Sequence, residues 1–198
     1  MTDPAPRIEA GAPRPRQRLS QRQASTVTAL LDAGLDHLRD PGYDQITLRA
    51  VAARAGVTHT TAYNYFTSKA HLVAEIFWRH LSAVPTPSPG ADLALEDRIT
   101  QALNGPGLLL ADEPALADAA LSALLLSDPD IRRLRNAIGL DLSLRIEIAI
   151  GPDADPEVVE AVLLAFSGAM LQAGMGYFDF AGVVPRISKL AALLQPRT

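Results

Sequence analysis

Apolar residues recur at every third or fourth position along most of the chain, which is the spacing of one face of an α-helix. The first such run lies between a capping box, Ser20 with Gln23, and the helix-stopping pair Pro41-Gly42; its apolar residues are Val27, Leu30, Leu31, Leu35 and Leu38. Three further helices are expected over residues 47–55, 58–65 and 68–81. A period of two never persists for long enough to predict a β-strand. The pattern therefore predicts an all-α fold.

The same helical spacing continues beyond a run of prolines at positions 85, 87 and 89. Alternation of proline with small residues predicts a stiff, extended boundary over residues 85–90. Asp128-Pro129 and Asp155-Pro156 each have the order of an N-cap followed by a first-turn proline. Helices are expected after the boundary at 91–104, 106–111, 113–126, 129–149, 155–175 and 184–194.

Composition narrows the possible functions. The chain has 198 residues, of which 48% are hydrophobic and 20% charged, a globular balance. The absence of cysteine excludes disulfides, thiolate metal sites and cysteine nucleophiles. Charge is uneven, because residues 1–82 carry a net +3 and residues 83–198 a net −7. This asymmetry predicts a basic part that reads nucleic acid, joined to an acidic body.

Two observations bear on the compartment. The N-terminus is rich in proline and arginine and lacks the pattern of a secretory signal, so a cytoplasmic protein is expected. The uncharged stretch 161–178 approaches the length of a membrane span, but it contains serine, glutamine and three glycines. We interpret it as a helix buried on nearly all sides, within a bundle or at a subunit interface, and expect no membrane partner.

Residues 47–65 contain the spacing of a helix-turn-helix. Thr47 can cap a first short helix, in which Ala52 is small enough for a second helix to cross closely. Gly56 suits the left-handed turn between the helices, Val57 can fill the corner, and Thr58 can cap the second helix. That second helix presents short polar groups and tyrosines, which suit base edges and phosphate oxygens.

These residues resemble the signature of TetR-type transcriptional regulators. The matching positions are Gly42-Tyr43, Thr47, Ala52, Ala55-Gly56-Val57-Thr58, Thr61, Tyr63, Tyr65-Phe66, Ser68-Lys69 and Leu72, so the match covers roughly residues 26–81. The chain departs from the pattern at Thr60, where the family usually has glycine, and at Ala62, where it usually has leucine. The smaller Ala62 predicts a tighter crossing of the two helices.

The resemblance implies which residues contact DNA. Phosphate contacts are expected from Thr47, Thr58, Thr61, Tyr63, Tyr65 and Lys69, and base contacts from Arg49, His59, Thr60 and Asn64. Arg14, Arg16 and Arg18 form an arm that either reaches a groove or only solubilises the chain. Alternatives remain for Arg49 and Lys69, which can be ordinary solvated residues, and for Tyr65, whose ring can pack inside.

The C-terminal helices predict a subunit interface. The helix over 155–175 has apolar residues on two faces and a ridge of alanines spaced by four. With the last helix it predicts half of a four-helix homodimer interface, formed by Val162, Ala165, Phe166, Ala169, Ala173, Ile187, Leu190 and Leu194. The alternative is an unusually apolar internal core.

An effector pocket is expected in the same part of the chain. Its candidate lining is Leu110, Leu121, Leu125, Ile138, Phe166, Met170 and Tyr177, which predicts a largely apolar small-molecule ligand. His71 and Glu75 lie four residues apart, but two ligands are too few for a metal site, and no metal, other cofactor or catalytic residue is expected.

These expectations combine into one hypothesis about domains and function. The predicted parts are a disordered basic arm (1–18), a helix-turn-helix DNA-binding domain (19–84), the proline-rich boundary (85–90) and an effector-binding and dimerisation domain (91–198). The expected function is a dimeric regulator that binds a palindromic double-stranded operator, a repressor released by an apolar effector. Control by a protein partner, or activation, is the alternative. An α-helical enzyme is remote, since the chain lacks a P-loop, a nucleophile elbow and a metal cluster.

Overall fold

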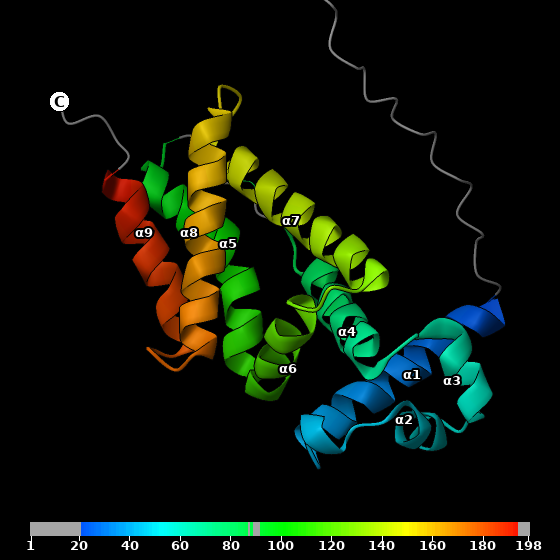
Figure 1. The fold of residues 1–198 in the computed structure, drawn as a ribbon. Helices are drawn as coiled ribbons and strands as arrows, with labels where there is room; N and C mark the ends of the chain where they lie inside the picture. Colours follow the sequence, from blue (N-terminus) through cyan, green and yellow to red (C-terminus); the bar gives the residue numbers. More distant parts are fainter. Residues whose placement is uncertain (1–20, 87, 89–91, 194–198) are drawn as a thin grey trace, which may run out of the picture.

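The computed structural model describes residues 21–86, 88 and 92–193, and this part of the chain is helical without a strand (Figure 1). The all-α prediction is confirmed. In chain order the elements are α1 (Gln21–Arg39), η1 (Tyr43–Gln45), α2 (Leu48–Arg54), α3 (His59–Tyr65), α4 (Lys69–Ala83), α5 (Leu95–Asp112), α6 (Pro114–Leu124), α7 (Pro129–Ile150), α8 (Pro156–Gly174), η2 (Phe180–Gly182) and α9 (Val183–Leu193).

Helix α4 connects the two ends of the molecule. Helices α1 to α3 gather at one end, α5 to α9 gather at the other, and α4 packs against α1 on one side and against α6 and α7 on the other (Figure 1). The approach to α1 is close, because a Cβ added to Gly34 would lie 2.8 Å from Ile76 Cδ1. Buried apolar residues form one cluster that runs through both ends. A displacement of α4 would therefore change its packing against α1 at one end and against α6 and α7 at the other.

Helix α5 differs from the sequence prediction of two segments, 91–104 and 106–111. It is continuous through Gly105-Pro106, although proline removes one backbone hydrogen bond from a helix interior. Pro106 is buried, and Gly105 and Gly107 allow Val84 and Val184 to approach to within 2.4 and 2.5 Å of where a Cβ would stand. Packing against the body of the molecule therefore outweighs the local break.

Helix α8 is more exposed than its apolar sequence predicted. Among the described residues it is the one helix long and apolar enough to cross a membrane, but one such helix is weak evidence, since core helices pass the same test. Only 28% of its apolar window is buried. Leu164 and Leu171 are 65% and 41% exposed, seven residues apart on one face. Of the two predicted alternatives, enclosure within the chain's own bundle is wrong, because no helix among the described residues covers Leu164 and Leu171; burial at a subunit interface stays a prediction.

Candidate nucleic-acid interface and apolar cavity

Helices α2 and α3 form a compact pair with a capped start to each helix. The backbone N–H of Ala50 donates to Thr47 Oγ1 at 3.1 Å, and that of Thr61 donates to Thr58 Oγ1 at 3.2 Å. Between the helices Gly56 has a φ of +68°, which lets the chain turn without strain. These bonds define where α2 and α3 begin, and the turn at Gly56 joins the two helices.

The crossing of α2 and α3 depends on small residues. Ala52 is 1% exposed and Ala62 is fully buried. The N–H of Val57 donates to the carbonyl of Ala52 at 2.9 Å, which closes the corner between the helices. Ala62 therefore occupies the inner face of α3, and the residues on either side of it point outward.

The residues predicted to read bases all lie on the surface. Arg49, His59, Thr60 and Asn64 are exposed, and three of them come from α3. The residues predicted to contact phosphate are more mixed: Thr47, Thr58 and Tyr63 are exposed, whereas Thr61, Tyr65 and Lys69 are half-buried. The ring of Tyr65 packs against the core. The expected arginine arm at 14, 16 and 18, like the capping serine at 20, lies outside the described residues.

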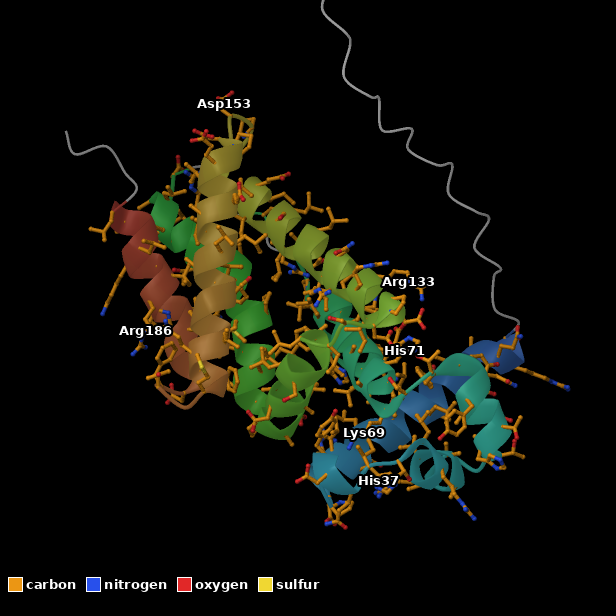
Figure 2. All side chains as sticks on the ribbon, viewed as in Figure 1. His37, Lys69, His71, Arg133, Asp153 and Arg186 are labelled. Carbon is orange, nitrogen blue, oxygen red and sulfur yellow. The ribbon has the colours of Figure 1, made fainter. Side chains whose placement is uncertain are left out.

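Lys69 is the first residue of α4 (Figure 2), and its side chain contacts Tyr43 of η1. Its Nζ donates to the carbonyl of Tyr43 at 3.3 Å and lies 4.3 Å from the centre of the tyrosine ring. Burial, followed by the nearby charge of Asp44, raises the pKa of the Tyr43 hydroxyl. A cation fixed beside α3 in this way is preorganised to meet a phosphate.

His71 joins α4 to the start of α7 (Figure 2). Its Nδ1 accepts the N–H of Thr67 at 3.2 Å and lies 3.9 Å from Asp130 Oδ2, and its Nε2 lies 3.6 Å from Glu75 Oε1. The imidazole is 6% exposed and meets the ring of Phe66 edge-on. Within the described residues no three His, Asp or Glu side chains gather as metal ligands. The geometry of His71 is that of a structural link between α4 and α7.

A cavity of about 480 Å³ lies between α4, α5, α6, α7 and α8. Six of the seven residues predicted for an effector pocket line it: Leu110, Leu121, Leu125, Ile138, Phe166 and Met170. Tyr177 does not, which corrects that prediction. It is 75% exposed, because α8 ends at Gly174 and the chain turns outward at Gly176, with a φ of +81°.

Sequence reasoning missed several residues of this cavity. Phe77 and Leu81 of α4 line it, so the helix that reaches the helix-turn-helix also touches the cavity. Of the eighteen lining residues only Arg135 is charged, and Ser167 is the only other one with a polar side chain. The helical period of α4 predicted an apolar face, but nothing in its sequence indicated which cavity that face would meet.

Four residues predicted for a subunit interface lie inside the chain instead. Val162, Phe166, Ala173 and Ile187 are at most 6% exposed, since α8 packs this face against α7 and α9. Ala165, Ala169 and Leu190 are half-buried, and Leu194 lies outside the described residues. The apolar side chains on the outer face of α7 and α8 are others: Leu140, Leu144, Ile148, Leu164 and Leu171, each more than 40% exposed.

Arg145 fastens α7 to the C-terminal end of α4 and was not singled out by the sequence. The side chain is 2% exposed. Its Nη2 donates to the carbonyl of Val84 at 2.7 Å, its Nη1 to that of Pro85 at 3.0 Å, and its Nε to Asp141 Oδ2 at 2.7 Å. Carbonyls at a helix end lack partners within the helix, so a buried guanidinium can satisfy them.

A second link joins α1 to α6. Arg39 donates to both carboxylate oxygens of Glu113, the residue just before α6. The hydrogen bond from Arg39 is the main cause that lowers the pKa of the Glu113 carboxyl. Burial acts in the opposite direction and raises this pKa, whereas the positive charge of Arg39 lowers it further. The Arg39 side chain is 50% exposed, so the pair orients the two helices more than it stabilises them.

Comparisons with known proteins agree with this geometry. Residues 30–76 match the family described as bacterial regulatory proteins, tetR family. An uncharacterized HTH-type transcriptional regulator of Mycobacterium tuberculosis is 39% identical over 177 residues, which are 88% of this chain and 83% of that protein. The HTH-type transcriptional repressor KstR of Mycolicibacterium smegmatis is 36% identical over 75 residues, 38% of this chain and 37% of that protein.

Solved structures show the same fold at lower sequence identity. A TetR transcriptional regulator from Rhodococcus sp. RHA1 superposes with a TM-score of 0.74 at 18% identity, over 89% of this chain and 99% of that one. The complex of SmeT with triclosan has a TM-score of 0.55 at 18% identity, over 85% of this chain and 90% of that one. The chain belongs to the TetR family: it is a DNA-binding transcriptional regulator and not an enzyme.

Proposed function

We propose that the chain is a cytoplasmic, dimeric repressor that binds a palindromic operator through α2 and α3 and leaves it when a largely apolar small molecule fills the cavity. The observation that carries the proposal is the position of α4. Only three residues separate α4 from α3, and Phe77 and Leu81 in the second half of α4 line the cavity. A repressor role is supported by the name of the relative KstR, and a small-molecule effector by the triclosan complex of SmeT.

In this proposal Arg49 of α2 and three residues of α3, His59, Thr60 and Asn64, read base edges, because all four side chains are exposed. Lys69 and the predicted threonines and tyrosines hold the phosphates. The effector acts by population shift. It binds best to the conformation in which α4 holds α2 and α3 in a position that does not fit the operator. Arg145 holds the C-terminal end of α4 against α7. In this proposal a displacement of α7 at the cavity therefore moves α4, and with it α2 and α3.

We place the dimer contact on the outer face of α7 and α8, where Leu140, Leu144 and Ile148 follow at intervals of four. The two helix faces adjoin at the cavity, whose lining includes Gly139, Leu164 and Leu171. An uncovered apolar surface of this kind is typical of an interface. Symmetric half-sites in the DNA require two heads held at a fixed spacing, which this contact would provide.

The test is a titration of fluorescent DNA from the region flanking the chain's own gene, with a scrambled duplex as control. Tight binding of the former, weakened by salt and reversed by apolar compounds, supports the proposal. Binding that no small molecule reverses would favour control by a protein partner. Higher transcription from that promoter in the presence of the protein would favour an activator.

A further inference from the structure

Arg135 is a cation at the edge of an otherwise apolar cavity. It is the one charged residue of the lining, on the first half of α7, and its side chain is exposed. Ser167 supplies the other polar side chain, and the remaining lining residues are hydrophobic, proline or glycine. A ligand that fills this cavity therefore meets apolar walls throughout and a positive charge at one edge.

One hydrogen bond orients the guanidinium of Arg135, and its other N–H groups make none within the described residues. Its Nη1 donates to the carbonyl of Leu124 at 2.7 Å, at the end of α6. Within the described part of the chain, Nε and Nη2 make no hydrogen bond, and no carboxylate lies within 4.0 Å of the side chain. On the same helix Arg133 is paired with Asp130 and Arg145 with Asp141. Arg132 also has no carboxylate within 4.0 Å among the described residues, but it lies outside the cavity lining. The Nε–Nη2 edge of an arginine is the fork that binds a carboxylate through two parallel hydrogen bonds.

From this arrangement we infer that the effector is an amphipathic carboxylate, with its apolar body in the cavity and its carboxylate on the free edge of Arg135. The inference rests on the proposed effector role of the cavity and adds the chemical class of the ligand. A neutral apolar molecule would leave the fork of Arg135 unused, and a cationic one would be repelled by it. The volume of about 480 Å³ lies within the range of small-molecule sites.

The test uses the full chain and three probes that share one alkyl tail: dodecanoate, dodecanol and dodecylammonium. Calorimetric titration is expected to show dodecanoate binding about tenfold tighter than dodecanol, since it adds charge-assisted hydrogen bonds, and dodecylammonium binding weakest. Arg135→Gln is expected to remove the preference for the acid while leaving the affinity for dodecanol unchanged. Arg135→Lys keeps the charge without the fork and should retain part of the preference.

Arg132→Gln is the matched control, because Arg132 is exposed on the same helix and outside the cavity lining. It should leave all three affinities unchanged. Equal binding of acid and alcohol by the unmodified chain, or an equal loss of both in Arg135→Gln, would overturn the carboxylate while the apolar effector cavity stands. Leu171→Trp, at the cavity edge, should block every probe. Binding of no probe, or binding that Leu171→Trp does not affect, would overturn both the effector cavity and this inference.

Discussion

Replacing Arg145 with methionine removes the charge that holds the end of α4 on α7. Three short hydrogen bonds are lost, and the carbonyls of Val84 and Pro85 and the carboxylate of Asp141 lose their partner. Leaving one member of a buried ion pair unpartnered costs about 3–5 kcal/mol. Asp141 is 22% exposed and can recover some hydration, so we expect a loss of about 3–4 kcal/mol. That is a large part of the ~5–15 kcal/mol by which a domain is stable.

The measurement is urea unfolding followed by far-ultraviolet circular dichroism, at a fixed protein concentration because the stability of the proposed dimer would depend on concentration. Arg132→Met is the control: it removes an exposed arginine from the same helix and should change the free energy of unfolding by less than about 0.5 kcal/mol. A loss below about 1 kcal/mol in Arg145→Met would refute the reasoning, since water or a repositioned side chain would then be satisfying the end of α4.

Three further changes test other parts of the account. Lys69→Ala should weaken binding to all DNA sequences alike and lower the slope of log affinity against log salt concentration by about one unit per half-site. Arg49→Ala should instead cost about 1–3 kcal/mol of binding free energy at one base position. An operator mutant series at several salt concentrations distinguishes the two variants, and identical behaviour would contradict the assigned roles. Leu144→Glu should yield a folded monomer in sedimentation experiments while Leu193→Glu, 71% exposed on α9, stays dimeric; a dimeric Leu144→Glu protein excludes that face. Glu113→Gln should lower the free energy of unfolding by less than about 1 kcal/mol at neutral pH. This difference from the unmodified chain should vanish as the pH falls well below 4.5, because a carboxyl with a lowered pKa stabilises the fold only while it is ionised. A difference that persists in acid would contradict the ion pair.

The helix-turn-helix formed by α2 and α3 was predictable because it depends on interactions between residues close together in the sequence. Thr47, Gly56 and Thr58 act through hydrogen bonds and backbone angles within a few residues, so their spacing alone indicates the helix-turn-helix. The same reasoning failed at Pro106, where the local break is overridden by packing against residues far away in the sequence.

Features that depend on distant parts of the chain could not be predicted. Arg145 meets carbonyls some sixty positions earlier in the chain, and no local pattern marks it. Periodicity identified the apolar faces of α8 but not which face its own neighbours would cover, so Val162 and Phe166 were assigned to an interface and are buried inside. Six predicted cavity residues did meet, because all are apolar residues of helices that surround one space.

The measurement that tests the central claim most directly is a DNase footprint on DNA flanking the chain's own gene. The account predicts one protected region with two-fold symmetric half-sites about one helical turn apart or further, and its loss in a variant with Asn64→Ala and His59→Ala in α3. Arg22→Ala, on the exposed start of α1, serves as the control and should leave the footprint intact. An asymmetric footprint, or a symmetric one that the α3 variant keeps, would contradict the claim that α3 reads a palindromic operator.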